Sequence, residues 1–403
     1  MNILQITNTA CTDSNQSTGV NRMVTQLSNC LANDYGNVFF HAFLVEGQCE
    51  VTPLFKQTFH IKNPFDTAGF KDFLVQNSID VVLFNFAGDS MLDFLPDICS
   101  VSHELKINVI YCFHFMPGYE GCSHGSFEEV RYSIHARQGF QDKFKKMVIT
   151  LTRPLSSRFI QFALKKKYDV PYRNCDHIVV FTDKYIDRYL DIVRDDNRFK
   201  FSAIPNPLSF DGKLGADELQ DKQKEVIYVG RLVEAQKKVS YILKIWKQIE
   251  KNPLLRDWKL SVVGDGKDEL FYRWLTRKYN LQNVSFEGRQ DPRPYYKRAS
   301  IMMSTSSYEG WPMVMMEAMP MGCCVVAFDT YDAIRDIVDD GYNGFVVPDN
   351  AIKAYAECLT ELMLNAEKRH AIGVHAMETC QRFSMDTIAG KWQSLFLKMC
   401  QTE

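Results

Sequence analysis

Short apolar runs alternate with longer amphipathic or polar segments along this sequence, and the alternation limits the folds that it can adopt. In the first half, the expected strands are Ile3–Thr7, Val38–Val45, Val81–Phe86, Val109–Phe113 and His177–Phe181. Parallel strands need a crossover segment between them, so this pattern predicts a parallel sheet covered by helices on both faces. The expected fold class is α/β, of the doubly wound kind.

A second series of the same kind begins near Glu225. Its expected strands are Glu225–Gly230, Lys259–Val263, Val284–Phe286, Ile301–Ser304, Cys324–Phe328 and Gly344–Val347. Between the two series, Pro205-Asn206-Pro207 cannot continue a helix or a central strand, and a polar connection follows. A chain of 403 residues is long for one hydrophobic core. We therefore expect two domains, residues 1–204 and 205–383, with an amphipathic helix in 384–401.

The composition excludes several classes of protein. A hydrophobic content of 46% and a charged content of 24% are typical of globular proteins, and a net charge of -2 argues against binding nucleic acid. Twelve scattered cysteines without a CxxC pair indicate a reducing compartment. The first residues predict a strand and not a signal peptide, and no apolar stretch is long enough to span a bilayer. We expect a cytoplasmic protein.

The segment 131–168 differs from the rest of the chain because basic and apolar side chains alternate in it with Asp142 as the one acid before Tyr168. Its basic residues include Lys165, Lys166 and Lys167. Such a mixture suits a peripheral helix or hairpin on the inner face of a membrane with anionic lipid. A solvated basic face on helices that pack onto the domain explains it equally well.

The stretch Ser306–Asp329 contains two glutamates, Glu309 and Glu317, with seven residues between them. Pro312 suits the first turn of a helix, and the start of that helix favours an anion such as a phosphate. The two glutamates would have Cα atoms about 8–12 Å apart, which suits holding two parts of an elongated ligand. From the spacing alone, a capped helix with solvated glutamates is the more common explanation.

A basic group follows the first strand of the second domain. Arg231, after Gly230, offers a planar fork of donors, and Lys237 or the adjacent Lys238 offers a point charge. Together they suit a diphosphate, although such residues are also common on surfaces. The carboxyl ends of parallel strands meet at one edge of a sheet, so this group and Glu309 are expected to converge there.

Two residues of the first domain stand at corresponding places. Gly19 lies at a helix entrance after the first strand, where a ligand can approach the backbone closely, although no GxGxxG fingerprint is present. His114 follows the strand Val109–Phe113. A histidine there can donate to a sugar hydroxyl or handle a proton, or it can simply close the strand.

Several collinear segments of the second domain resemble the family 4 retaining glycosyltransferases, the glycosyl transferases group 1. These segments are residues 228–246, 262–266, 286–329 and 339–348. The first domain matches only in outline, through the first strand, the Gly19 loop and the strand that ends before His114. The resemblance implies the GT-B fold, in which two Rossmann-like domains face each other across a cleft. It also implies that helix 384–401 packs back on the first domain.

The resemblance implies a role for each candidate residue. Arg231 and Lys237 would hold the donor diphosphate, and Glu317 would bind the ribose hydroxyls. Glu309 would lie at the donor sugar near the anomeric carbon. The implied catalytic residues are Glu309, Arg231, Lys237 and His114, and the implied donor-binding residues are Gly19, Gly230, Gly310, Trp311, Pro312, Met313 and Glu317. Two departures from the family pattern are the single glycine of Ser17-Thr18-Gly19-Val20 and Trp311 in place of phenylalanine.

The implied activity is transfer of a hexose-type sugar from a UDP- or GDP-linked donor to an acceptor hydroxyl, with retention at the anomeric carbon. The acceptor would be a carbohydrate or lipid-linked molecule in surface polysaccharide or glycolipid assembly. No cofactor or metal is expected, because no DxD-type acidic site is apparent and cationic side chains replace it. The alternatives are a sugar-nucleotide epimerase of GT-B type and a non-catalytic sugar-binding protein of this fold.

Overall fold

The computed structural model describes residues 1–9, 11, 19–44, 52–86, 91–122, 129, 132, 167–209, 212, 214–215 and 217–401. The chain divides into two compact units. The first unit consists of Met1–Gly118, Gln161–Ser209 and Phe383–Glu403, and the second consists of Tyr119–Ile160 and Phe210–Arg382. Residues 132, 167 and 168 apart, the basic segment 131–168 lies outside the described residues.

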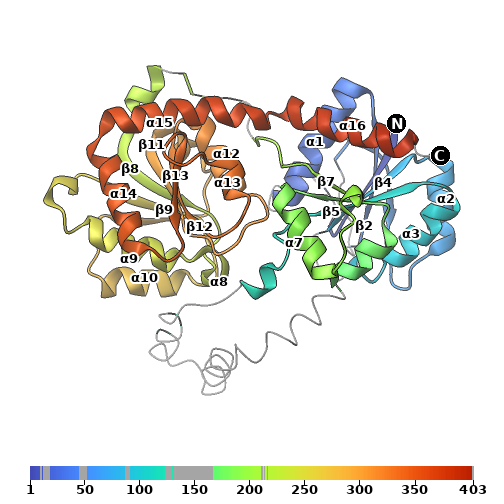
Figure 1. Cartoon of the computed structure of the whole chain (residues 1–403), viewed down its shortest axis with the longest axis horizontal. Helices are drawn as coiled ribbons and strands as arrows, with labels where there is room; N and C mark the ends of the chain where they lie inside the picture. The colour runs from blue at the N-terminus through green and yellow to red at the C-terminus, as the bar shows by residue number, and fades with distance from the viewer. Residues whose placement is uncertain are drawn as a thin grey trace. The chain divides into compact units, whose positions relative to one another are not determined.

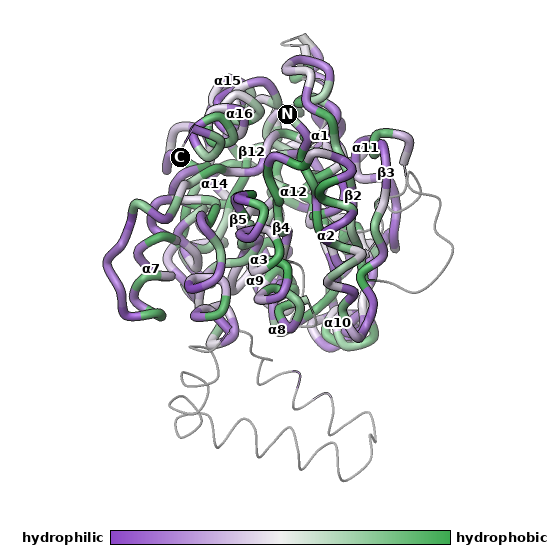
Figure 2. The backbone as a smooth tube through the Cα atoms, turned by 90° about the vertical axis from the view of Figure 1, so that its right-hand side faces the viewer, coloured by the Kyte–Doolittle hydropathy of each residue, from purple (hydrophilic) through white to green (hydrophobic). Residues whose placement is uncertain are grey.

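The first unit contains a seven-stranded parallel sheet in the order β3-β2-β1-β4-β5-β6-β7. Its strands are β1 (Asn2–Thr7), β2 (Val38–Phe43), β3 (Phe55–His60), β4 (Val81–Phe86), β5 (Asn108–Phe113), β6 (His177–Val180) and β7 (Phe201–Ala203). The central strands are predominantly hydrophobic, as the green colour of β4 shows in Figure 2, because helices cover both faces of the sheet. The edge strands β3 and β7 are additions to the expected set.

Helices complete the core of the first unit. They are α1 (Gly19–Tyr35), α2 (Thr67–Gln76), α3 (Leu95–Glu104), α7 (Asp183–Val193) and α16 (Met385–Gln401). Helix α16 lies alongside α1 (Figure 1), and Trp392 and Phe396 join Leu27 and Leu31 in one buried cluster. The last helix of the chain therefore supplies part of the core that begins with its first strand.

The second unit contains a six-stranded parallel sheet in the order β10-β9-β8-β11-β12-β13. Its strands are β8 (Gln223–Val229), β9 (Lys259–Val263), β10 (Val284–Gly288), β11 (Ala299–Ser304), β12 (Cys324–Asp329) and β13 (Gly344–Pro348). Both sheets are parallel and α/β, as the alternating pattern predicted. The strand order reverses between β8 and β11, which is where ligands usually bind in such sheets.

The helices of the second unit occupy the segments between and after the expected strands. They are α8 (Glu234–Lys237), α9 (Val239–Ile249), α10 (Glu269–Lys278), α11 (Arg293–Arg298), α12 (Met313–Ala318), α13 (Ile334–Ile337), α14 (Ile352–Leu364) and α15 (Ala366–Thr379). Helix α9 buries Ile242, Leu243 and Trp246 against the sheet. None of the helices in the described residues combines the length and hydropathy needed to cross a bilayer.

Candidate functional site

The candidate site lies at the carboxyl ends of β8 and β11, which are hydrogen-bonded parallel neighbours. Strand β8 leads into Gly230, Arg231 and the short helix α8, and β11 leads into the loop that carries Glu309. Because parallel neighbours end at the same edge of a sheet, two segments about 70 residues apart in sequence meet here. The expected convergence of the basic group with Glu309 is therefore present in the second unit.

Glu309 and Lys237 form the centre of this site. The Nζ of Lys237 donates to Oε1 of Glu309, and the two side chains are only 12% and 10% exposed. Gln236 extends the contact, since its Nε2 lies 3.4 Å from Oε2 of Glu309 and its Oε1 accepts from Arg231 at 3.0 Å. Gln236 thus connects Arg231 with Glu309, and Lys237 contacts the same carboxylate directly, so both cations expected at a diphosphate lie beside the carboxylate expected at a sugar.

Backbone contacts hold α8 against the loop after β11. The hydroxyl of Thr305 donates to the carbonyl oxygens of Lys237 and Lys238, each at 3.0 Å, and the amide of Ser307 donates to the carbonyl of Gln236 at 2.7 Å. Of the two adjacent lysines, Lys237 is the one whose ammonium reaches Glu309. This geometry favours Lys237 over Lys238 as the site lysine.

Two glycines after β9 fix the position of the Gly230 loop. Gly264 has φ +138, and a Cβ added to it would lie 2.0 Å from the carbonyl oxygen of Gly230. A Cβ on Gly266 would lie 2.5 Å from the carbonyl oxygen of Leu232. The amide of Gly230 donates to Val263 at 3.0 Å, which ties the loop to β9. Only residues without side chains permit this close approach of two backbones, which sets the place of Arg231.

Glu317 is buried inside α12, with 3% of its surface exposed, and accepts a hydrogen bond from the hydroxyl of Tyr296 at 2.9 Å. The helix begins at Met313, one residue later than expected, with Pro312 as the residue before its first turn. The amide of Met313 donates to the carbonyl of Trp311 at 2.9 Å, so that amide is used within the loop. Trp311 and Pro312 are buried, whereas Gly310 is half-buried.

Gly19 and His114 belong to the first unit, whereas the nine other predicted site residues belong to the second. Gly19 is the first residue of α1. His114 directly follows β5, and its Nε2 lies 3.1 Å from Oδ1 of Asn85 at the end of β4. Burial lowers the pKa of His114 to about 4, so its imidazole is neutral near pH 7.

Comparison with known proteins identifies the second unit. Residues 213–379 match the family model for the glycosyl transferases group 1. This region belongs to that family. The resemblance noted in its motifs is therefore confirmed, and the site residues of the second unit, from Gly230 to Glu317, lie within the matched region.

Two curated relatives match this chain over longer stretches than the family model does. An uncharacterized glycosyltransferase of Haemophilus influenzae is 28% identical over 223 residues, which are 55% of this chain and 61% of that protein. An α-1,4-N-acetyl-D-galactosaminyltransferase of Campylobacter jejuni, with a PP-undecaprenol-linked acceptor by name, is 27% identical over 235 residues, 57% of this chain and 62% of the relative. The chain thus spans less than two thirds of either relative's length.

A solved structure shows the same fold over the whole chain. HepE of Anabaena in complex with UDP-glucose has a TM-score of 0.69 at 14% identity, covering 99% of this chain and 100% of that one. The two parallel α/β sheets of this chain therefore match those of GT-B glycosyltransferase structures, as expected.

Sequence reasoning missed three side chains that support the site. Gln236 directly precedes the predicted site residue Lys237, and this position was the one sign in the sequence that Gln236 belongs to the site. Tyr296 lies 21 residues from Glu317, and no pattern in the sequence connects the two. Asn85 ends a predicted strand, as His114 does, and two adjacent strand ends could have indicated their contact.

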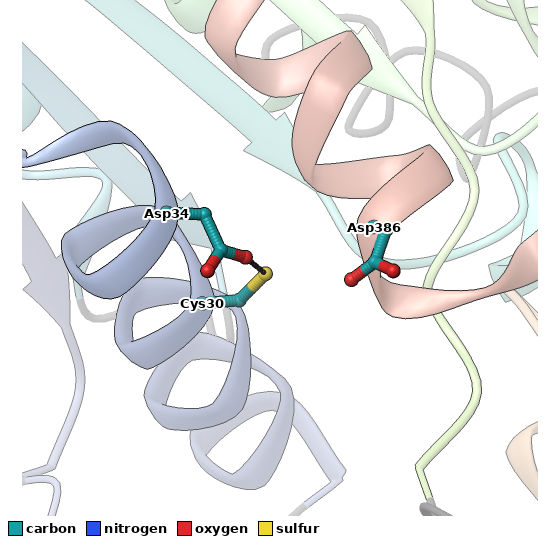
Figure 3. Close-up of side chains that lie close together, drawn as sticks. All are labelled: Cys30, Asp34 and Asp386. Atoms are coloured by element: carbon teal, nitrogen blue, oxygen red, sulfur yellow. Dashed lines mark hydrogen bonds between the residues drawn. The ribbon is translucent and has the colours of Figure 1, made fainter.

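Within the described residues, one group of side chains has the spacing to hold a metal ion. Cys30 and Asp34 on α1 and Asp386 on α16 bring their ligand atoms within 4.8 Å of one another (Figure 3). The thiol of Cys30 donates to Asp34 at 3.1 Å, and both carboxylates are exposed. These residues come from helices and not from strand ends, and an exposed acidic pair of this kind is common without a metal.

A pocket of about 430 Å³ lies near the amino ends of β8, β11 and β12, at the opposite edge of the second sheet. Two of its cations already serve as helix caps. Lys222 donates to the carbonyls of Tyr296 and Ala299 at 2.7 and 2.8 Å, and Arg369 donates to the carbonyl of Leu362 at the end of α14 at 2.7 Å. Their charges therefore stabilise helix ends, and the pocket is a weaker candidate than the edge at Glu309.

Proposed function

We propose that this chain is a retaining glycosyltransferase that moves a hexose-type sugar from a nucleotide diphosphate sugar to an acceptor hydroxyl. The observation that carries the proposal is the junction of Arg231, Lys237 and Glu309 through Gln236, in a region of the group 1 glycosyl transferases. Two cations beside one carboxylate match a ligand whose diphosphate is joined directly to a sugar.

The proposed reaction breaks the bond between the anomeric carbon and the diphosphate oxygen. A bond between that carbon and the acceptor oxygen forms on the same face, and the acceptor proton passes to an oxygen of the leaving phosphate. Arg231 and Lys237 stabilise the negative charge that grows on the diphosphate. Glu309 contacts the donor sugar, and Glu317 contacts the ribose hydroxyls of the nucleotide. Burial of Glu317 requires Tyr296 to share that carboxylate with the ligand.

The first unit supplies the remaining contacts in this proposal. Gly19 lies against the donor phosphate or sugar, and His114 contacts the donor sugar. The half-buried backbone at Gly310, together with Trp311, Pro312 and Met313, shapes the sugar side of the site, and Gly230 lets the diphosphate approach the backbone after β8.

UDP-sugars are the first donors to test, because HepE was solved with UDP-glucose. A growing polysaccharide or a lipid-linked oligosaccharide is the proposed acceptor, since the relative in Campylobacter jejuni is named for a PP-undecaprenol-linked acceptor. GDP-sugars stay in the panel because no side chain contact described above selects the base.

Metal independence is part of the proposal, because Arg231 and Lys237 supply the positive charge that a divalent cation would otherwise provide. We expect the transfer rate to be unchanged when EDTA is added to the assay. A rate that falls with EDTA and recovers with Mg²⁺ or Mn²⁺ would contradict this part of the proposal. The second unit's cations would then assist a metal and would not replace it.

A cytoplasmic location with peripheral contact to the inner face of the membrane, through 131–168, is also proposed. Co-sedimentation with liposomes of stated anionic lipid content tests it. We expect binding to rise with anionic lipid and to fall when Lys165, Lys166 and Lys167 are changed to glutamate. Binding that ignores both changes would support a solvated basic face.

A donor screen followed by a product assay tests the activity. The purified protein is first heated with UDP-glucose, UDP-galactose, UDP-N-acetylgalactosamine and GDP-mannose, because a ligand that binds the folded chain raises its unfolding temperature. The stabilising donor is then incubated with and without a lipid-linked acceptor. We expect an acceptor-dependent glycoside whose anomeric configuration matches the donor. An epimer formed without acceptor would indicate the epimerase alternative, and donor binding without turnover would indicate a sugar-binding protein.

A further inference from the structure

A chain of polar side chains crosses the core of the first unit and ends at His114. It begins at Ser28 on α1 and passes through Gln5 on β1 and Asn85 on β4. These three residues are 0%, 1% and 2% exposed. Polar groups buried this deeply are costly unless their hydrogen bonds are made. The orientation of each of these three side chains is therefore tightly specified.

The direction of the Asn85 amide follows from its neighbours. Its Nδ2 lies 2.6 Å from Oε1 of Gln5 and 3.4 Å from the carbonyl oxygen of Leu83. A carbonyl oxygen only accepts hydrogen bonds, so the amide atom that faces Leu83 must be the nitrogen. The Nε2 of Gln5 then continues the chain to the hydroxyl of Ser28 at 3.2 Å.

The amide oxygen of Asn85 consequently faces His114. Its Oδ1 lies 3.1 Å from Nε2 of the imidazole, and because this oxygen also only accepts, Nε2 must carry the proton. Among the described residues, Nδ1 of His114 has no hydrogen-bond partner. The ring nitrogen that is left for a ligand is therefore the one with a lone pair.

We propose that Asn85 is a positioning residue: it fixes His114 as the neutral Nε2–H tautomer, so that Nδ1 accepts a hydrogen bond from a hydroxyl of the donor sugar. This inference rests on the proposed function, which places His114 at the donor sugar. The histidine then acts as an acceptor toward the sugar, and its one N–H is used by Asn85. A donor sugar must offer a hydroxyl or N–H at this point, and an analogue without one loses the contact.

The low pKa of His114 agrees with this geometry, because burial keeps the ring uncharged near pH 7. A charged imidazolium would carry protons on both nitrogens and could accept nothing from a hydroxyl. The Asn85 contact alone selects which nitrogen of the neutral ring keeps its proton.

Nitrogen-15 NMR of the full chain at pH 7 tests the tautomer directly. The His114 signals are assigned by their loss in His114→Gln. We expect one proton-bearing nitrogen, Nε2, and one nitrogen with the shift of a lone pair, Nδ1. In Asn85→Leu we expect a mixture of tautomers, whereas Asn85→Asp, which keeps an oxygen facing Nε2, retains the Nε2–H form. An Nδ1–H form or a mixture in the unsubstituted protein overturns the proposal.

Binding of UDP-glucose and UDP separates positioning from structure. We expect Asn85→Leu and His114→Ala each to weaken the affinity for UDP-glucose by about 3- to 10-fold, which is the contribution of one hydrogen bond. The affinity for UDP should stay unchanged. The double variant should lose no more than His114→Ala alone, because Asn85 acts through the histidine. If the two substitutions weaken UDP-glucose affinity additively, or weaken UDP affinity equally, Asn85 has a structural role and the proposal is overturned.

Asn37→Leu is the matched control, since Asn37 is also buried in the first unit and its Nδ2 donates to Gln393 at 2.7 Å. It should lower the unfolding temperature and leave both the His114 spectrum and the ratio of UDP-glucose to UDP affinity unchanged. If His114→Ala does not change UDP-glucose binding while the spectrum shows the Nε2–H form, the assignment of His114 to the donor sugar fails and the tautomer assignment stands.

Discussion

The carboxyl edges of the two sheets have similar topology and opposite chemistry. In the second unit, this edge carries three charged groups: Glu309 contacts Lys237 directly and Arg231 through Gln236. In the first unit, the corresponding edge carries His114 and Asn85, which are neutral near pH 7 and linked to a buried amide. In the proposed function, the two cations of the second unit hold the diphosphate, and the neutral His114, held by Asn85, adds a hydrogen bond to the sugar that Glu309 also contacts.

The charged edge should be the more sensitive of the two to a single substitution. In the proposed function, Arg231→Ala removes the guanidinium that stabilises the growing charge of the leaving group, and we expect the transfer rate to fall about 10²- to 10³-fold. The unfolding temperature should hardly change, because Arg231 is exposed. A steady-state assay with the donor found by screening measures this effect, and Arg273→Ala, an exposed arginine on α10, is the control. Near-normal transfer by Arg231→Ala would remove the proposed role.

The position of the charged loop depends on the backbone contact at Gly264. Gly264→Ala places a Cβ at φ +138 and 2.0 Å from a backbone oxygen, so we expect a loss of about 3 kcal/mol in unfolding free energy and weaker UDP binding. Gly341→Ala is the control, because it has φ +78 with no atom within 4 Å of the added Cβ. Denaturant unfolding and UDP titration compare the two. Equal losses would show that backbone conformation alone, and not the contact with Gly230, explains the effect.

The first unit should lose stability in acid, because it also buries neutral histidines in its sheet. Burial lowers the pKa of His41 to about 3 and that of His177 to about 4, below the ordinary value of 6.5. The unfolded chain therefore takes up protons first, and stability is lost as pH falls from about 6.5 toward these values, by up to about 1.4 kcal/mol per pH unit for each proton. Urea unfolding of His41→Gln between pH 7 and 5 should give a shallower decline than the unsubstituted protein. His370→Gln, which removes a histidine at an exposed site on α15, is the control.

We expect the smallest effect from removing the hydrogen bond to the buried carboxylate of Glu317. Tyr296→Phe removes one hydroxyl from Glu317, and we expect UDP affinity to change by a few-fold and unfolding free energy to fall by about 1 kcal/mol. Tyr272→Phe is matched to it, since this hydroxyl donates to the buried Glu234 at 3.1 Å in the same unit. Both variants should be less stable, and only Tyr296→Phe should alter UDP binding. The same change in both would assign Tyr296 to packing alone.

The sequence was most informative where hydrophobic pattern and motif coincide. Parallel α/β sheets followed from alternating apolar runs, and the convergence of Arg231, Lys237 and Glu309 followed from the rule that parallel strands end at one edge, whereas the direct contact of Lys237 with Glu309 was not predicted. The edge strand β3 escaped prediction because Phe55–His60 buries only Phe55 and lacks an apolar run. The strand β7 has only three residues, which is too short for a pattern.

The parts that the sequence could not supply are contacts between residues far apart in the chain. Nothing in the pattern around Asn85 indicates that its amide is oriented by Gln5, since the two are 80 residues apart. The close approach of Gly264 to Gly230 is likewise a property of two adjacent strand ends and not of either motif. Local patterns predict elements and place motifs at their ends, whereas tautomers and side-chain partners depend on tertiary packing.

Because helix α16 is made last, the core of the first unit is completed only after the second unit has been synthesised. Trp392 and Phe396 of α16 complete a buried cluster with residues of α1, yet the ribosome makes them after every residue of the second unit. The second unit can fold as soon as it emerges, while the first must wait with an apolar face of α1 uncovered. The apolar face of α1 that α16 covers therefore stays exposed until the last helix is made, so the first segment of the chain is the last to reach its final packing.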